Sequence, residues 1–247
     1  MTGWGEASSI CLQGSLEFVV ASGVHLSAKG RPPRDRAVAV RARPRQSRAR
    51  FTAEALQDAF VQVLVEHGYA KTTVREVADV AGVSVGSFYR YFGNMRTLAA
   101  RCISDAAREA EREAREAVEP LRGEPIANIV EVLVDRLVRS VMGNARVWRA
   151  LIRLERTVSA EAAFRSHYDA YVSLWADALA LADKPPPEDQ RNYMARMLHM
   201  ISYGWLSQIL LTLDEPPSRR LRIELNRAIQ GYLALCVSPA MSDCPSP

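Results

Sequence analysis

The chain has 247 residues, of which 48% are hydrophobic and 24% charged, as in an ordinary folded globular protein. Its four cysteines are scattered without a Cys-x-x-Cys pair, which argues against a structural metal site and a disulfide framework. No apolar run approaches the roughly 18 residues of a membrane helix, and the first residues lack the positive charge of a signal peptide. We therefore expect a cytoplasmic protein without a metal, a cofactor or membrane contact.

The net charge of +4 is concentrated near the N-terminus. Residues 29–50 hold nine basic side chains and one acid, so this segment carries +8 and the rest of the chain −4. Such a concentration favours a polyanion partner, although a solvated tail has the same composition. Residues 1–50 lack helical or strand periodicity, so they are predicted to be a disordered, Arg-rich N-terminal extension. A translation start placed too far upstream is an alternative explanation for residues 1–45.

A first helix is predicted from residue 51 onward. Apolar side chains between Ala55 and Leu64 form one helical stripe. Thr52 is the expected N-cap of this helix and Gly68 its expected C-cap.

Two short helices are predicted next, separated by a tight turn. The hydroxyl of Thr73 can cap the second helix, and Glu76 completes a Thr-x-x-Glu capping box. This helix is expected to end at Gly82, since glycine accepts a positive φ without strain. Ser84 is the expected cap of a third helix that ends near Phe92.

The rest of the chain also has helical patterns. Residues 94–119 are rich in Ala, Glu and Arg, which are strong helix formers, and Pro120 ends the segment. Further helices are predicted between proline and glycine breaks, at about 126–142, 145–157, 159–183, 188–213 and 218–237. No convincing strand is found. The predicted fold class is all-α.

The segment 73–92 has the spacing of a helix-turn-helix. A small residue, Ala78, is followed four positions later by Gly82 at the turn and six positions after that by Phe88 as a core anchor. In this motif the second helix lies in the DNA major groove. The alternative is a tight helical hairpin with no DNA role.

The second helix of this motif is predicted to expose side chains suited to DNA. The Arg90 guanidinium fits a phosphate or a guanine edge, and Val85 and Gly86 are small enough for close approach to bases. Hydroxyl groups for phosphate contacts come from Ser84, Ser87, Tyr89 and Tyr91.

Residues 51–98 closely resemble the N-terminal DNA-binding domain of TetR-family transcriptional regulators. The matching residues are Phe60, Gly68, Thr72, Thr73, Val77, Ala78, Ala81, Gly82, Val83, Ser84, Gly86, Phe88, Tyr89, Tyr91, Phe92 and Leu98. The resemblance covers about a fifth of the chain. The later helices fit the family only in number and length.

The resemblance implies a homodimer whose DNA-binding heads (51–98, motif 73–92) each lead into a linker helix. It also implies a helical ligand-binding and dimerisation domain at 99–237, followed by a flexible tail at 238–247. By position, Thr73 and Arg75 would begin the second helix near DNA, and Tyr89 and Tyr91 would hold the DNA backbone. Val85, Gly86, Ser87 and Arg90 would face bases or adjoining phosphates.

One position departs from the family, which usually has a lysine three residues after Phe92 that donates to a phosphate. This chain has Met95 there, and we expect the neighbouring Arg96 to reach across instead. The basic segment before the first helix resembles the arms with which some helix-turn-helix proteins enter the minor groove. Arg45, Arg48 and Arg50 are the predicted members of this arm.

Aromatic and methionine side chains are enriched in the C-terminal half. Repeats at helical spacing suggest an apolar pocket for a small hydrophobic effector, although ordinary core packing gives the same pattern. The predicted pocket residues are Trp148, Tyr168, Tyr171, Trp175, Met197 and Tyr203. His167 could orient a ligand, but a histidine with a structural partner or in solvent is the more common case. No catalytic constellation is present, so no enzyme activity is predicted.

The helices near 188–213 and 218–237 are apolar on one side, as in helices that pair across a two-fold axis. We therefore predict a homodimer that reads an inverted-repeat operator in double-stranded DNA. The predicted function is a ligand-responsive regulator of transcription, a repressor released by its effector. Two alternatives are an architectural DNA-binding protein without ligand response and a small-molecule-binding helical protein. The operator, the effector and the regulated genes do not follow from the sequence.

Overall fold

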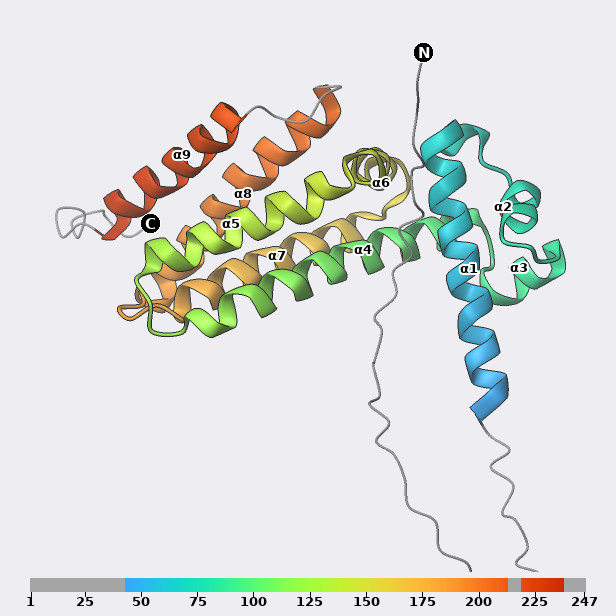
Figure 1. The fold of residues 1–247 in the computed structure, drawn as a ribbon, viewed down its shortest axis with the longest axis horizontal. Helices are drawn as coiled ribbons and strands as arrows, with labels where there is room; N and C mark the ends of the chain where they lie inside the picture. The colour runs from blue at the N-terminus through green and yellow to red at the C-terminus, as the bar shows by residue number, and fades with distance from the viewer. Residues whose placement is uncertain (1–42, 213–218, 238–247) are drawn as a thin grey trace, which may run out of the picture. The chain divides into compact units, whose positions relative to one another are not determined.

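The computed structural model describes residues 43–212 and 219–237, and these form α-helices and 3-10 turns without a strand (Figure 1). The all-α prediction is confirmed. The elements are α1 (Arg43–His67), η1 (Tyr69–Lys71), α2 (Val74–Val80), α3 (Val85–Tyr91), α4 (Met95–Val118), η2 (Glu119–Leu121), α5 (Ile126–Gly143), α6 (Ala145–Val158), α7 (Glu161–Ala180), α8 (Glu188–Thr212) and α9 (Arg219–Val237). The predicted extension up to residue 42 and the tail at 238–247 lie outside the described residues.

The junctions of the predicted motif are confirmed. The Thr73 hydroxyl accepts the Glu76 N–H at 3.2 Å, and the Ser84 hydroxyl accepts the Ser87 N–H at 3.1 Å. Gly82 has φ +67°. Around it, the Val83 N–H donates to the Ala78 carbonyl and the Gly82 N–H to the Asp79 carbonyl, at 2.9 and 3.1 Å. These two bonds form a Schellman motif, which ends α2 and lets α3 begin two residues later.

The first helix begins earlier than predicted. Because α1 starts at Arg43, residues 43–50 are helical and the prediction of disorder is wrong for them. Thr52 is therefore not an N-cap; its hydroxyl donates to the Arg48 carbonyl one turn earlier, at 3.0 Å. Arginine, glutamine and alanine are good helix formers, and Pro44 lies in the first turn, where a missing N–H breaks no helical bond. Gly68, with φ +74°, ends the helix as expected.

A first hydrophobic core, the head core, holds α1, α2 and α3 together. Phe60 and Phe88 are fully buried in it. The head core also takes in side chains of α4 and α6, so it extends beyond residues 51–98. Its contributions from these two helices are Leu98, Ala99, Cys102, Ile103, Leu151, Leu154 and Val158.

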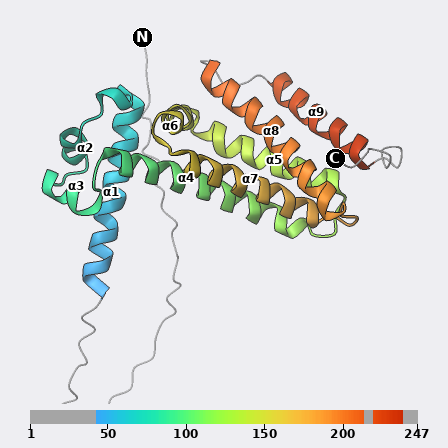
Figure 2. The same ribbon diagram turned by 180° about the vertical axis from the view of Figure 1, so that it is seen from behind.

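A second core, the body core, joins α5, α7, α8 and α9 to the C-terminal half of α4. Figures 1 and 2 show α4, α5 and α7 running alongside one another, and α9 beside α8. Trp175 is the largest fully buried side chain, and Ala114 and Val118 bring α4 into the same core. Within the described residues, no helix is long and apolar enough to cross a membrane.

Two phenylalanines of α1 give a direct test of the head core. Phe60 is 0% exposed and Phe51 is 68% exposed. We expect Phe60→Ala to lower the free energy of unfolding by about 3–5 kcal/mol because it leaves a cavity among packed side chains. Phe51→Ala should change it by less than about 0.5 kcal/mol. Urea unfolding followed by circular dichroism measures both, and equal effects would contradict the assigned core.

Candidate nucleic-acid interface and ligand cavity

The predicted DNA-contact residues of the motif are brought to the surface of α2 and α3. Phe88 faces the core, whereas Val85 is 38% and Tyr89 56% exposed. Gly86 and Arg90 are also exposed, and Ser87 and Tyr91 are partly so. Helix α3 is amphipathic: its apolar face packs on the head core, and its opposite face is exposed to solvent.

Three polar side chains on α3 are linked in a row. The hydroxyl oxygens of Ser84 and Ser87 lie 3.0 Å apart, and Arg90 Nη2 donates to Ser87 Oγ at 3.3 Å. The Arg90 guanidinium also lies 5.5 Å from the centre of the Tyr91 ring, within range of a cation–π contact. These contacts orient Arg90 before any partner binds, which lowers the entropy lost when it forms a bidentate contact.

Gly86 is not required by the fold of the free protein. A Cβ placed there meets only Ser84 Oγ, at 3.7 Å, which is an ordinary van der Waals distance. Gly82 differs, because its positive φ strains any other residue. The lack of a side chain at Gly86 therefore leaves space on the exposed side of the start of α3, and this space is not required for the packing of the free protein.

At the start of α2, Thr73 and Arg75 are exposed as predicted. The Thr73 oxygen accepts the Glu76 N–H, which leaves the hydroxyl proton free to donate to an anion. The Glu76 carboxylate lies 3.3 Å from His67 Nε2. That contact connects the end of α1 to α2.

The structure corrects the prediction of a minor-groove arm, because the residues of that arm belong to helix α1. Arg48 and Arg50 are exposed, but they lie on a helix rather than on an extended chain. Arg50 Nε donates to Glu54 at 2.8 Å. The side chain of Arg45 lies outside the described residues. In Figures 1 and 2 the N-terminal part of α1 projects beyond α2 and α3, so this part of the helix extends the head surface.

Arg96 has a different partner from the one expected. Its Nε donates to the carbonyl of Val158 at the C-terminal end of α6, at 2.7 Å. A cation is stabilised at this end of a helix by the helix dipole. Arg96 thus joins the start of α4 to α6, and we assign it to this structural contact instead of a phosphate contact.

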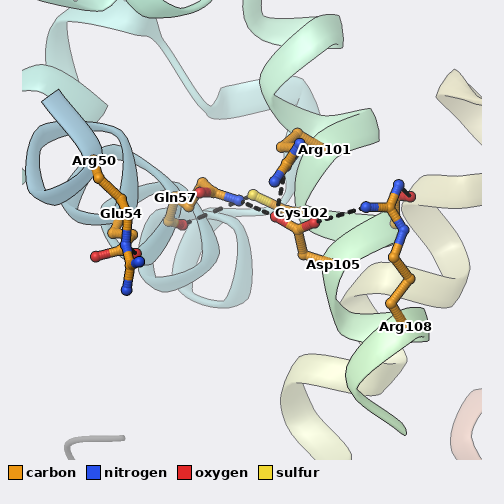
Figure 3. Close-up of polar contacts among 8 residues, drawn as sticks. Arg50, Glu54, Gln57, Arg101, Cys102, Asp105 and Arg108 are labelled. Carbon is orange, nitrogen blue, oxygen red and sulfur yellow. Dashed lines mark hydrogen bonds and ion pairs between the residues drawn. The ribbon is translucent and has the colours of Figure 1, made fainter. Parts of the chain in front are cut away.

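A polar cluster fixes α1 against α4 (Figure 3). Asp105 accepts hydrogen bonds from Gln57 Nε2 of α1 at 2.8 Å and from Arg101 Nε at 2.7 Å. The neighbouring Cys102 is buried. Its burial, and to a lesser extent the negative charge of Asp105, raises the pKa of its thiol to about 12. A protonated, buried thiol is inert, so Cys102 is a packing residue and not a reactive one.

The C-terminal helices enclose an apolar cavity of about 280 Å³ between α4, α5, α6, α7 and α8. Five of the six predicted pocket residues line it: Trp148, Tyr168, Tyr171, Trp175 and Tyr203. Met197 does not. It is 40% exposed on α8, and Met200 lines the cavity instead. Residues at i, i+3 and i+6 drift by about 60° per step around a helix, so the three methionines of α8 face different ways.

The most prominent polar group of the cavity, His199, was not predicted. Its ring lies 5.3–5.7 Å from the rings of Tyr168, Tyr171 and Tyr203. Burial lowers the pKa of His199 from 6.5 to about 4, so the imidazole is neutral at physiological pH. The only sequence signal was a histidine on an otherwise apolar helix face.

His167, considered from the sequence as a ligand contact, does line the cavity. Its Nδ1 lies 2.8 Å from the carboxylate of Glu155, a second cavity residue that sequence reasoning missed. Among the described residues, no group of His, Cys, Asp and Glu could hold a metal ion.

Two side chains belong to both the head core and the cavity wall. Ile103 of α4 and Leu151 of α6 pack in the head core and also line the cavity. A change in the shape of the cavity therefore acts directly on residues that support the head.

Comparison with known proteins matches residues 56–102 to the model of a family described as bacterial regulatory proteins, tetR family. The HTH-type transcriptional repressor KstR of Mycolicibacterium smegmatis is 31% identical over 65% of this chain and 76% of its own length. An uncharacterized HTH-type transcriptional regulator of Haemophilus influenzae is 30% identical over 52% of this chain, but only 62% of that relative is covered. A transcriptional regulator of Rhodococcus sp. Rha1 has a similar fold, with a TM-score of 0.61 and 20% identity over 76% of this chain and 99% of its own.

The neutral, buried His199 predicts a pH-dependent stability. Its pKa is lower in the folded chain than in the unfolded chain, so the unfolded state binds more protons between pH 6.5 and about 4. The free energy of unfolding should therefore fall as the pH drops through this window, by up to about 3 kcal/mol from this group.

The variant His199→Phe should show a smaller fall over this pH window than the wild-type protein. Urea unfolding at several pH values measures both. Identical slopes for wild type and His199→Phe would contradict the assignment.

Proposed function

The chain belongs to the TetR family of bacterial regulatory proteins, and we propose that within this family it is a dimeric, ligand-responsive repressor. The relatives are transcriptional regulators rather than enzymes. KstR, which shares 31% identity, is named a repressor, and this favours repression over activation. The observation that carries the proposal is the sharing of Ile103 and Leu151 between the head core and the cavity wall.

The exposed face of α3 supports sequence-specific DNA binding. Arg90, held by Ser87 and Tyr91, presents a guanidinium of the kind that reads guanine in the major groove. The space above Gly86 lets the helix start approach the base edges. Around this centre, Thr73, Arg75 and Tyr89 offer donors to phosphates. Arg48 and Arg50 on the extended α1 would add attraction to the DNA backbone that depends on salt.

The cavity supports a response to a small hydrophobic effector. It is enclosed mainly by apolar and aromatic side chains and has a few polar groups, as expected of a small-molecule site. A ligand that favours one arrangement of α4 and α6 shifts the protein toward that arrangement by its difference in affinity. Because Arg96 ties the start of α4 to the end of α6, such a shift also moves the heads.

The outer faces of α8 and α9 support a homodimer. Both helices carry a row of exposed apolar or small residues, here named the α8–α9 stripe. Its members are Tyr193 and Met197 on α8 and Leu221, Ala228, Gly231 and Leu235 on α9. Small residues let helices from two subunits approach closely. Two heads related by a two-fold axis would then read an inverted repeat.

Binding to a pool of random duplexes tests the DNA-binding part of the proposal. At about 150 mM salt we expect retained DNA to be enriched in an inverted repeat. Arg90→Ala should weaken binding to the enriched site by about 1–3 kcal/mol. Arg165→Ala removes the same charge from an exposed position of α7 and should have little effect.

Retention without enrichment, lost steeply as salt rises, would favour an architectural DNA-binding protein. A protein that binds no DNA but binds apolar ligands would be a small-molecule-binding helical protein. A compound that fills the cavity should release the operator, and one that binds without changing DNA affinity would contradict the ligand response.

The α8–α9 stripe predicts the effect of a buried charge on assembly. Leu235 is 64% exposed in the single chain and would be covered in the dimer. Leu235→Glu should convert the dimer to monomer at micromolar concentration, because each unpaired buried charge costs about 3–5 kcal/mol. Val80→Glu, at a 45% exposed site on α2, is the control. Light scattering after gel filtration measures the mass; a dimeric Leu235→Glu variant would exclude this interface.

A further inference from the structure

Trp175 has a buried polar group that no atom of the described residues satisfies. The residue is 0% exposed and lines the cavity, and its indole Nε1 has no hydrogen-bond partner among the described residues. A buried indole N–H usually finds an acceptor, because losing water without a replacement is unfavourable. Because Trp175 lines the cavity, this unpaired donor is a candidate partner for an acceptor atom on a bound molecule.

Three hydroxyl donors of the cavity wall are already engaged by backbone carbonyl groups. The Tyr171 hydroxyl donates to the Ala107 carbonyl at 3.3 Å, and Ser207 donates to the Gly204 carbonyl at 3.2 Å. Ser202 donates to the Leu198 carbonyl at 2.6 Å. These three protons are therefore not free for a ligand. Trp175 Nε1–H differs from these three donors, because it is buried without a hydrogen-bond partner among the described residues.

The charges around the cavity select against an ionic ligand. The residues that line it include no lysine and no arginine, so a buried carboxylate or phosphate would have no counter-ion. The one acid, Glu155, is engaged by His167 at 2.8 Å. His199 occupies the space between the rings of Tyr168, Tyr171 and Tyr203, which would otherwise suit a cation.

The cavity volume limits the size of the ligand. An apolar cavity of about 150 Å³ holds benzene, so one of about 280 Å³ has room for roughly twice that, about a dozen non-hydrogen atoms. Along α7, His167 and Trp175 are eight residues apart, which corresponds to about 12 Å. A molecule of two fused rings or a medium-length chain fits these limits.

Building on the regulatory function proposed above, we propose that the effector is a neutral, largely apolar carbonyl compound whose oxygen accepts the Trp175 Nε1–H. The aromatic and aliphatic walls bind its hydrocarbon part. The indole then sets its orientation and distinguishes it from the corresponding hydrocarbon. The class includes ketones, esters and thioesters whose buried part has this size.

Binding of 1-tetralone and of tetralin, the same bicyclic compound without the carbonyl, tests the proposal on the purified full-length protein. We expect 1-tetralone to bind about three- to tenfold more tightly, the range of one net hydrogen bond. Trp175→Phe should remove this preference. Trp148→Phe makes the same change in another wall of the cavity and should preserve it.

Proton NMR of the indole groups gives a readout in the unmodified protein. The Trp175 Nε1–H resonance, assigned by its absence in Trp175→Phe or by elimination with the other tryptophan variants, should move downfield with 1-tetralone but not with tetralin. An unmoved resonance, equal affinities, or a preference that survives in Trp175→Phe would overturn the proposal. Tighter binding of the cationic 1-aminotetralin would also overturn it, as would failure of all three compounds to bind at millimolar concentration.

These measurements concern ligand binding alone. If no inverted repeat is enriched but the carbonyl preference holds, the regulatory function fails and the ligand class stands. If operator binding is specific but the carbonyl preference is absent, the ligand class fails and the regulatory function stands.

Discussion

The buried face of α4 is the constraint on which the rest of the structure depends. Leu98 and Cys102 near its start pack in the head core, and Ala114 and Val118 near its end pack in the body core. Because the same unbroken helix serves both cores, the head cannot be displaced without disturbing the helices around the cavity. Gln57 and Arg96 add polar contacts at the head end, where α1 and α6 meet α4.

The two proposed binding functions belong to different environments, DNA binding to the surface and ligand binding to the interior. The α3 side chains that face outward are polar, linked to one another and need no packing partner. The cavity is the opposite, with a few polar groups enclosed by aromatic rings, where a missing hydrogen bond weighs more than in water. Helix α6 lies between these environments: Leu154 and Val158 support the head, Trp148 and Glu155 line the cavity, and Leu151 does both.

Local chemistry explains which features were predictable from sequence. The caps at Thr73 and Ser84 and the turn at Gly82 depend on neighbouring residues, so their spacing identified the motif correctly. The start of α1 was missed because prolines and charge obscured a stretch of good helix formers. Cavity residues on α7 were predicted from helical spacing, whereas Glu155 and His199 acquire their roles only when α6, α7 and α8 meet. Met197 was misplaced because a three-residue spacing does not keep one helix face.

Cys102 gives this architecture a natural reporter. Its thiol lies against α1 at the Gln57 carbonyl and is buried, so a reagent can reach it only when α1 separates from α4. The rate of its modification therefore measures how often the head core opens, in the way that amide exchange measures local unfolding. Cys236, on α9, is partly exposed and gives the rate of a reactive reference thiol in the same chain. If the cavity and the head are coupled, a compound that binds in the cavity would change the modification rate of this one thiol.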